Sequence, residues 1–332
     1  MYPLRFNPIF RRYIWGGRRL ADTLGKQIGE GDDYAESWEI VDHDQDQSVV
    51  AFGDLEGQTL NSLIREYQSR LLGKKVFEQI TDGRLPDALQ YRFPLLFKFL
   101  DANRTLSVQV HPDDELAALK EPADLGKTEA WYVVDAQQDA KIYAGLKTGV
   151  DSDELRIAAD TGKTEEVLNS FHPTAGDCVF IPAGAVHAIG EGLLVAEIQQ
   201  SSDTTYRLFD WNRVDKQGNA RELHVNEAIH ATDYRLGPIE SQKPKAMSQA
   251  QVVELVACDK FVMNRWTTDQ PINLFGDDRF RILAITRGEL NISGDPSGQP
   301  LTLGQTALLP ACLEKVDLIP NGEVELLEIY VP

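Results

Sequence analysis

The sequence predicts a mainly β fold in which two jelly-roll barrels follow one another along the chain and helices are inserted into the first. Three observations lead to this prediction. Strand-forming segments dominate the chain, a turn motif spans Gly176–His187, and a partial copy of that motif spans Gly304–Lys315. With 332 residues, the chain is long enough to bury two hydrophobic cores.

Composition excludes several classes of partner. Apolar residues make up 42% and charged residues 26% of the chain, as in ordinary globular proteins, and the formal net charge is -19. So acidic a surface repels nucleic acid and anionic membranes, and we expect neither as a partner. Without a long apolar run or metal-type cysteine spacing, we expect a cytoplasmic protein. We expect a monomer or a weak homodimer, and the sequence leaves the oligomeric state open.

Helices are expected at three places in the first barrel, at about residues 55–90, 113–126 and 151–170. In the first of these, apolar residues recur at spacings of three and four, the period of an amphipathic helix. These residues are Leu60, Leu63, Ile64, Tyr67 and Leu71. The other two segments have helical composition and interrupt runs of strand formers.

The chain divides by composition into three parts. Residues 1–235 are predicted to form the catalytic barrel, 236–250 a linker rich in Pro, Lys, Ser and Gln, and 251–332 a second barrel. The second barrel repeats the glycine and proline of the turn motif but has Lys315 at the position of His187, so we expect no metal there. A chance likeness between two strand turns is the alternative.

Two polar residues share one face of a predicted strand. The run 93–110 is dense in strand formers and breaks at 101–103, which predicts two strands in a hairpin. In the second strand, valines alternate with Gln109 and His111, so both polar side chains point into one cavity. The Gly176–His187 motif is also read as a hairpin, and its last residue points into the same cavity.

A metal site follows from these residues together with Glu129. We expect Glu129 and His187 on neighbouring strands, which brings one amide, two imidazoles and one carboxylate together. Such a mixed nitrogen and oxygen set suits Zn²⁺ or another divalent first-row ion. Any single histidine could instead be an ordinary polar residue whose hydrogen bonds are satisfied. We expect this, and no role as a metal ligand, for His43, His172, His224 and His230.

Basic residues lie close to these candidate ligands. Lys98 is embedded in the apolar run PLLFKFL, Lys127 shares the strand parity of Glu129, and Arg207 follows the His187 strand. A metal beside converging cations in an acidic protein predicts an anionic, oxygen-rich substrate.

At this point the sequence resembles a known family. The segments LSVQVHPDD, GKTEAWYVV, IPAGAVHAIGEG and EIQQSSDTTYRLFDWNR, in that order, are similar to the type I mannose-6-phosphate isomerases of the cupin superfamily, in particular to their short bacterial form. With YIWGG and AESWEI, the resemblance covers most of residues 1–235. It implies a cupin with one Zn²⁺ per chain that interconverts mannose 6-phosphate and fructose 6-phosphate.

The resemblance also implies roles for particular residues. The metal ligands would be Gln109, His111, Glu129 and His187. Arg207 matches the active-site arginine of the family, which would stabilise an enediolate or bind phosphate, and Lys127 is the candidate base. Three further residues match positions that line the family's pocket, namely Lys98, Ser107 and Asp203. One departure from the longer members is Ile189, where those carry a tyrosine.

The residues alone are also compatible with two other functions. Two histidines and one carboxylate also form the facial triad of non-haem Fe(II) oxygenases, although that alternative leaves Gln109 and the basic residues without a role. The other alternative is a cupin that binds a sugar phosphate without catalysis. The sequence leaves the native metal, the identity of the base and the physiological direction open.

Overall fold

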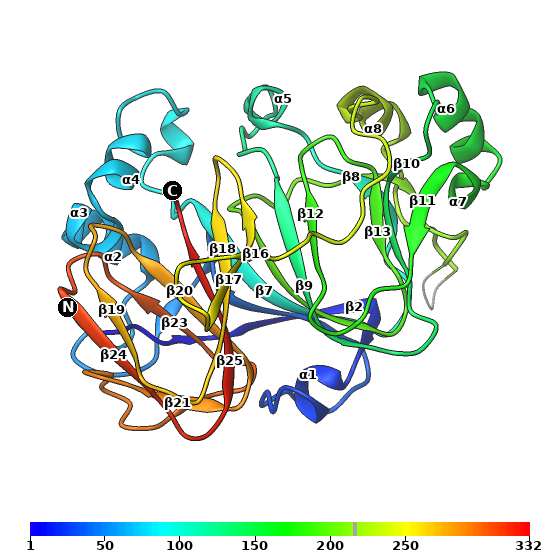
Figure 1. Cartoon of the computed structure of the whole chain (residues 1–332). Helices are drawn as coiled ribbons and strands as arrows, with labels where there is room; N and C mark the ends of the chain where they lie inside the picture. The colour runs from blue at the N-terminus through cyan, green and yellow to red at the C-terminus, as the bar shows by residue number, and fades with distance from the viewer. Residues whose placement is uncertain (215–217) are drawn as a thin grey trace.

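The computed structural model describes residues 1–214 and 218–332, and within them strands dominate, which confirms the predicted mainly β fold. Two pairs of packed sheets succeed one another along the chain (Figure 1). Each pair is a sandwich with apolar residues from both sheets in its core, rather than a closed ring of hydrogen-bonded strands in the described part of the chain.

The first pair combines a six-stranded and a five-stranded sheet. The six-stranded sheet runs in the order β12 (Cys178–Ile181), β9 (Glu129–Ala136), β14 (Leu193–Gln200), β7 (Leu95–Ala102), β3 (Tyr34–Ile40), β2 (Ile9–Gly17). The five-stranded sheet runs in the order β11 (Leu168–Phe171), β10 (Ile142–Leu146), β13 (His187–Ile189), β8 (Val108–Val110), β15 (Tyr206–Phe209). Two small ribbons lie outside them, β1 (Phe6–Asn7) with β6 (Val49–Val50), and β4 (Asp42–His43) with β5 (Asp46–Gln47).

The second pair combines a six-stranded and a four-stranded sheet. The larger one runs in the order β16 (Lys245–Ala246), β17 (Val252–Ala257), β18 (Val262–Thr268), β25 (Val324–Tyr330), β20 (Arg281–Arg287), β23 (Thr306–Leu309). The smaller one runs in the order β19 (Ile272–Phe275), β24 (Lys315–Pro320), β21 (Glu289–Ile292), β22 (Leu301–Thr302).

Strand order is the same in the two pairs. Strands β8 to β14 have sheet neighbours that match those of the strands eleven places later, β19 to β25, except that β15 extends the first pair beside β8. β7 and β18 match on one side, at β14 and β25, and their other neighbours are β3 and β17. Chance likeness of one turn would not reproduce a whole strand order. The correspondence therefore supports the internal repeat that the turn motifs predicted.

Helices occur in the three predicted segments, and others follow β2 and β15. They are α1 (Arg19–Asp22), α2 (Leu60–Tyr67), α3 (Ser69–Leu72), α4 (Lys74–Gln79), the 3₁₀ turn Asp87–Leu89, α5 (Asp114–Ala118), α6 (Ser152–Asp160), α7 (Thr164–Val167) and α8 (Val225–Ala231). The side chain of Thr59 caps α2, and Asp151 with Glu154 forms a capping box on α6. The predicted helical stretch 151–170 ends at Val167, because the residues that follow pair with β10 as β11.

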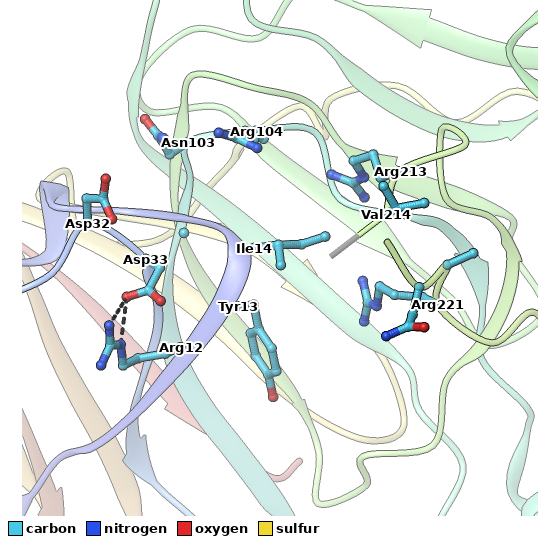
Figure 2. A pocket seen from close by; sticks show the side chains of 13 residues that line it. Arg12, Tyr13, Ile14, Asp32, Asp33, Asn103, Arg104, Arg213, Val214 and Arg221 are labelled. Atoms are coloured by element: carbon cyan, nitrogen blue, oxygen red, sulfur yellow. Dashed lines mark hydrogen bonds and ion pairs between the residues drawn. The ribbon is translucent and has the colours of Figure 1, made fainter. Parts of the chain in front are cut away.

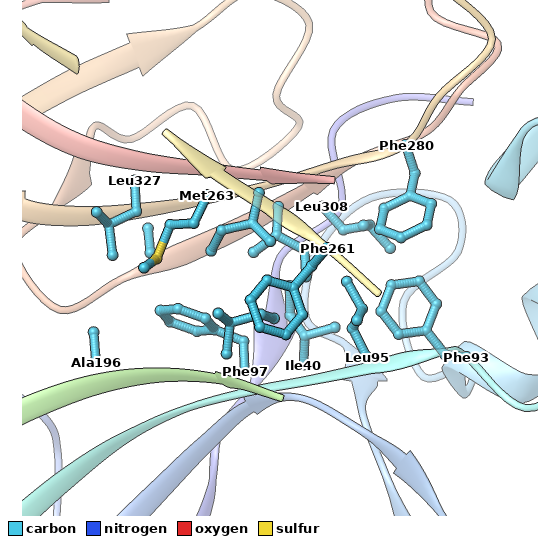
Figure 3. Packing of buried hydrophobic residues seen from close by; sticks show 14 of the residues in the cluster. Ile40, Phe93, Leu95, Phe97, Ala196, Phe261, Met263, Phe280, Leu308 and Leu327 are labelled. Carbon is cyan, nitrogen blue, oxygen red and sulfur yellow. The ribbon is translucent and has the colours of Figure 1, made fainter. Parts of the chain in front are cut away.

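One large apolar core lies between the two pairs of sheets (Figure 3). Phe93 and Phe280 pack with ring centroids 4.9 Å apart, and Phe97 and Phe261 are fully buried between the sheets. Burial of one such phenylalanine contributes about 1.5–3 kcal/mol. Apolar residues of α2 and α4 join this core, so the first helical segment covers both pairs rather than the first alone.

Both predicted hairpins are wrong. β7 pairs with β3 and β14, whereas β8 pairs with β13 and β15 in the other sheet. Likewise β12 pairs with β9, and β13 with β10 and β8. Each turn therefore carries the chain from one sheet of the sandwich to the other, and the strands it joins face each other across the core.

The division into 1–235, 236–250 and 251–332 stays a prediction. Leu4 exchanges backbone hydrogen bonds of 2.8 Å with Leu308, so the start of the chain contacts the second pair of sheets. Within the predicted linker, the Gln242 amide donates to the Cys178 carbonyl at 2.7 Å, and Lys245–Ala246 already forms β16. No helix of the described residues is long and apolar enough to cross a membrane.

Candidate metal centre and active-site cavity

The four candidate ligands come from both sheets of the first pair. Gln109 of β8 and His187, the first residue of β13, are direct cross-strand partners. His111 follows β8 by one residue. Glu129 opens β9 in the facing sheet, so it is not on a strand adjacent to His187 as expected, but reaches the imidazoles across the sandwich.

Three of these side chains converge on one point. Nε2 of His187 lies 3.3 Å from Oε1 of Glu129, and Nε2 of His111 lies 3.4 Å from Oε2 of the same carboxylate. One ligand atom from each residue lies within 4.8 Å of the others, and all three residues are buried. Their donor atoms therefore have the spacing that a single divalent cation requires.

Backbone carbonyl oxygens hold the Nδ1 atoms of both imidazoles, on the side away from Glu129. Nδ1 of His111 lies 2.9 Å from the carbonyl oxygen of Thr204, and Nδ1 of His187 lies 2.9 Å from that of Ala185. A carbonyl oxygen can only accept, so each Nδ1 carries the proton and each Nε2 presents a lone pair toward Glu129. This is the tautomer that a metal ligand needs.

Two polar atoms at this point lack hydrogen-bond partners. Nε2 of His111 and Oε2 of Glu129 are fully buried, and neither makes a hydrogen bond within the described residues. Leaving a buried polar atom unsatisfied costs about 1–3 kcal/mol. A cation between these atoms would satisfy both, so the residues fit a metal ion.

Gln109 lies beside the three converging side chains. Its Nε2 is 3.3 Å from Nε2 of His187, and its Oε1 accepts a hydrogen bond of 3.4 Å from the Ser107 hydroxyl. A half turn of the amide exchanges the two atoms and presents Oε1 to the metal position. Gln109 is therefore placed to provide a neutral oxygen ligand.

The charge state of the centre suits a cation. Burial, followed by the charge of Lys127, lowers the pKa of His111 to about 3, and burial also lowers the pKa of His187. Burial opposes ionisation of Glu129, but Lys127 and the histidines outweigh it and hold its pKa well below the usual range. Neutral imidazoles and an ionised carboxylate are the forms that bind metal.

A cavity of about 220 Å³ opens onto this centre. Gln109 and Glu129 line it, whereas His111 and His187 lie behind its wall. The predicted pocket residues all line it as well, namely Lys98, Ser107, Lys127, Asp203 and Arg207. The structure thus brings together every site residue singled out in the sequence.

Lys98 is buried against two carboxylates. Its Nζ lies 3.2 Å from Oε1 of Glu197 and 3.6 Å from Oε2 of Glu36. Burial alone would lower the pKa of Lys98, but the two carboxylates outweigh it and raise that pKa. The charge of this lysine is therefore neutralised within the protein.

Lys127 lies in the loop just before β9, whereas Arg207 lies in β15 of the facing sheet, and both line the cavity. Nζ of Lys127 lies 3.3 Å from Oε2 of Glu129, in agreement with the shared strand parity. Nε of Arg207 donates to the Ser107 hydroxyl at 3.2 Å, and its Nη1 donates to the Glu222 carbonyl at 3.1 Å. Asp203 is exposed at the rim.

Several cavity residues escaped sequence reasoning. Glu36 and Glu197 are buried and hold Lys98, and Trp131 donates to Glu197 at 3.0 Å. Burial and the charge of Glu129 raise the pKa of Glu197 to about 7. Glu197 lies in the apolar run LLVAEIQQ, and the same signal that selected Lys98 in PLLFKFL could have found it.

His224 lies closer to the site than was expected of it, although its hydrogen bond agrees with a satisfied polar residue. Although its sequence context gave no indication, His224 lines the cavity, and its Nδ1 accepts a hydrogen bond of 3.3 Å from the backbone amide of Arg207. The expectation that His172 is structural agrees with its position, since its Nδ1 lies 3.0 Å from the carbonyl of Ala140 and it does not line this cavity.

Comparison with known proteins identifies the family. Residues 4–145 match the model of the phosphomannose isomerase type I catalytic domain. The mannose-6-phosphate isomerase ManA of Bacillus subtilis is 36% identical over 312 residues, which are 93% of each chain. The chain belongs to the type I phosphomannose isomerase family. The mannose-6-phosphate isomerase of Streptococcus mutans is 32% identical over 98% of this chain and 97% of its own.

Solved structures of mannose 6-phosphate isomerases share the fold. The mannose 6-phosphate isomerase from Bacillus subtilis superimposes with a TM-score of 0.85 at 30% identity, covering 99% of both chains. The phosphomannose isomerase from Salmonella typhimurium superimposes with a TM-score of 0.77 at 16% identity over the whole of both chains, and here the likeness shows the fold alone. The second pair of sheets is therefore part of the architecture common to these proteins.

Proposed function

We propose that this chain is a metal-dependent aldose-ketose isomerase that interconverts D-mannose 6-phosphate and D-fructose 6-phosphate. The observation that carries the proposal is the group His111, Glu129 and His187, whose buried donor atoms converge beside a cavity lined by basic side chains. Two of these atoms, Nε2 of His111 and Oε2 of Glu129, have no hydrogen-bond partner within the described residues. Family membership supplies the substrate class, since the relatives are named mannose-6-phosphate isomerases.

The proposed cofactor is one Zn²⁺ per chain, held by Gln109, His111, Glu129 and His187. Two nitrogen and two oxygen donors are a common zinc set. When bound, such an ion acts as a Lewis acid on oxygens of the sugar.

Isomerisation moves a proton from C2 to C1 of the sugar, while the proton on O2 of mannose 6-phosphate is lost and one is gained at O1. We assign Lys127, in its neutral amine form, as the base that takes the C2 proton and becomes an ammonium, because its Nζ lies at the same end of the cavity as the ligand carboxylate of Glu129. Arg207 is assigned as the residue that stabilises the negative charge of the enediolate, because it lines the cavity and its guanidinium hydrogen bonds within residues 1–214 and 218–332 go to the Ser107 hydroxyl and the Glu222 carbonyl.

Substrate contacts are assigned to three further residues, namely Lys98, Ser107 and Asp203. Ser107 connects two parts of the site, because its hydroxyl donates to Gln109 and accepts from Arg207. Lys98 stays charged against its two glutamates and can donate to a sugar hydroxyl.

A coupled assay for fructose 6-phosphate formed from mannose 6-phosphate, with and without chelator, tests the proposal. We expect turnover by metallated protein, loss of turnover on chelation and recovery on addition of Zn²⁺. Absence of product from fully metallated protein would exclude the isomerase, and product-free binding of the substrate would indicate a binding protein. Oxygen consumption after reconstitution with Fe²⁺ would indicate the oxygenase.

Three broader assignments accompany this function. We propose residues 1–235 as the catalytic barrel, 236–250 as a linker and 251–332 as a barrel without metal. We also propose a monomer or weak homodimer, which sedimentation over a range of protein concentrations would test. A cytoplasmic location agrees with the three cysteines, which form no disulfide in the described chain.

A further inference from the structure

The segment 112–128 connects two ligands of the metal centre and carries the candidate base. It follows His111, begins α5 at Asp114 and ends where Glu129 opens β9. Lys127 is its last residue but one, and the Nζ of this lysine lies 3.3 Å from Oε2 of Glu129. A shift of this segment would therefore move the base relative to the metal centre.

The carboxylate of Asp114 binds the far end of this segment. Its Oδ1 accepts a hydrogen bond of 2.9 Å from the backbone amide of Gly126, the residue before Lys127. A glycine allows this close approach, because a β-carbon at position 126 would lie 2.5 Å from the backbone nitrogen of Asp114. The amide of Lys127 itself donates to the carbonyl of Pro112 at 3.0 Å. The start of the segment thus holds the backbone of the base.

Gln200 connects the same carboxylate to the residue after the base. Its Nε2 donates to Oδ1 of Asp114 at 2.9 Å, and its Oε1 accepts from the backbone amide of Thr128 at 3.1 Å. Gln200 ends β14, the neighbour of β9 in the six-stranded sheet. The backbone amides of residues 126–128 are therefore all hydrogen-bonded, and Asp114 holds the first directly and the third through Gln200.

Lys260 binds Asp114 from the second pair of sheets. It lies in the turn between β17 and β18, and its Nζ is 2.8 Å from Oδ2 of Asp114. The next residue, Phe261, is fully buried in the core between the two pairs of sheets, which fixes the turn. Burial opposes ionisation of Asp114, but its contact with Lys260 outweighs burial and lowers the pKa of Asp114. Asp114 therefore stays a carboxylate, which accepts stronger hydrogen bonds than a neutral acid.

These contacts lie outside the cavities of the site. The active-site cavity meets an outer cavity of about 730 Å³ at Tyr13 and Arg221, which line both (Figure 2). Asp114 and Lys260 line neither cavity, and no residue of 251–332 does. Both side chains can therefore act on Lys127 only through the protein.

We infer that Lys260 and Asp114 position Lys127, so that the second pair of sheets contributes to catalysis although it does not line the active-site cavity. The inference rests on the proposed isomerase function and on Lys127 as its base, and it adds two positioning residues. Proton transfer depends on the distance between the base and the carbon, and a displacement of about 1 Å can slow a reaction roughly 100-fold.

Substitution K260Q tests the inference. The side chains of Lys260 and Asp114 are 28% and 45% exposed, and so exposed a pair stabilises the fold little, so the variant should fold. We expect kcat to fall roughly 3- to 10-fold, with the KM for mannose 6-phosphate and the metal content within about twofold of the parent. K260R keeps a cation beside Asp114 and should recover most of the parental kcat. D114N should lower kcat at least as much as K260Q, because it also weakens the bonds to Gly126 and Gln200.

A double variant distinguishes positioning of the base from a general loss of activity. If Lys260 acts through Lys127, K260Q should slow exchange of the C2 hydrogen roughly 3- to 10-fold in the parent but less than about twofold in K127Q. Equal factors in the two backgrounds would overturn the inference, and so would a parental kcat in K260Q.

K245Q is the matched control. Lys245 of β16 is also a lysine of the second pair of sheets that binds a carboxylate, that of Glu254 at 3.3 Å, and its loss should leave kcat unchanged. If the metallated parent makes no fructose 6-phosphate, the isomerase proposal fails, and hydrogen–deuterium exchange of segment 112–128 then tests the contact itself. Faster exchange of amides 126–128 in K260Q than in the parent would support the positioning, whereas unchanged exchange would overturn it.

Discussion

Arg281 occupies in the second pair of sheets the register position that Glu129 occupies in the first. Glu129 opens β9 and pairs with Ile181, the last residue of β12. Arg281 opens β20 and pairs with Leu309, the last residue of β23. Where the first sandwich places a candidate metal ligand, the second therefore places a fixed cation.

The cation has a buried carboxylate as its partner. Nε of Arg281 lies 2.7 Å from Oε1 of Glu328, and Trp266 donates to Oε2 of Glu328 at 2.9 Å. Lys315, which opens β24 as His187 opens β13, is exposed. A guanidinium inside the sandwich and the absence of an imidazole at this position agree with the prediction that the second barrel binds no metal.

Removal of this cation should destabilise the fold. R281M leaves Glu328 buried and unpaired, and breaking such a pair costs about 3–5 kcal/mol. Urea unfolding followed by circular dichroism would measure the loss. In the double variant R281M/E328Q the uncompensated charge is gone, so we expect part of the stability to return. A single variant as stable as the parent would show that the pair contributes nothing.

Removal of the ligand carboxylate should abolish metal binding. E129Q takes away the negative charge against which both imidazoles point, and we expect elemental analysis to find less than about a tenth of the parental metal content. Chelator should lower the thermal midpoint of the parent but not of E129Q, since a ligand stabilises only the protein that binds it.

H172Q serves as the control for this experiment. His172 bonds to the Ala140 carbonyl outside the centre, and its substitution should retain the metal. Full metal content in E129Q would show that Glu129 is not a ligand.

Local pattern could predict which face of a strand carries the site, but not the pairing of the strands. Alternation put Gln109 and His111 on one side, and both reach the metal centre; it also put Lys127 on the side of Glu129, where it lies. Strand alternation depends only on the backbone period, whereas pairing depends on long-range contacts. A short turn indicates a hairpin, yet in this sandwich the turns at 103–107 and 182–186 lead from one sheet to the other.

The buried glutamates of the site show a second limit of prediction from the sequence. An acidic residue in a strand is ordinarily solvated, and Glu36 in AESWEI gave no sign of facing inward, whereas the apolar run around Glu197 was such a sign. Only the strand order places β3 and β14 on either side of β7, where both carboxylates meet Lys98. His224 likewise enters the site through a loop, where no periodicity indicates the direction of a side chain.

Loss of the candidate base should lower the rate of isomerisation without weakening the binding of metal or substrate. K127Q removes the group that would take the C2 proton, and we expect kcat to fall roughly 10²- to 10⁴-fold. Metal content should persist, and so should binding of mannose 6-phosphate measured by calorimetry. Exchange of the C2 hydrogen with deuterated water, followed by NMR, should slow by the same factor.

K141Q is the control for Lys127, because Lys141 is an exposed lysine that does not line the active-site cavity. If K127Q exchanged the C2 hydrogen at the parental rate with metal bound, another residue would be the base.

Asp124 supports the metal ligand His111 indirectly, through Thr204. We therefore expect the stability of the folded protein and its metal binding to decrease in acid. Its Oδ2 accepts from the hydroxyls of Ser202 and Thr204 at 2.9 and 2.8 Å, and the carbonyl of Thr204 holds Nδ1 of His111. Burial opposes ionisation of Asp124, but the neighbouring imidazole of His43, 3.4 Å away, and the hydrogen bond from Thr204 outweigh it and hold its pKa well below the usual range.

The sign of the pH effect follows from this lowered pKa. A carboxylate with a lowered pKa stabilises the folded state above the ordinary aspartate pKa of about 4, and this contribution disappears as the pH falls toward the folded-state value. Urea unfolding at pH 7, 5, 4 and 3 should show the decline. D124N should lose about 1.5–3 kcal/mol at pH 7 and decline less on acidification. It should also release metal more readily at pH 7, because Thr204 no longer holds His111 in place. Equal pH dependence in the parent and D124N would show that acid acts through other carboxylates.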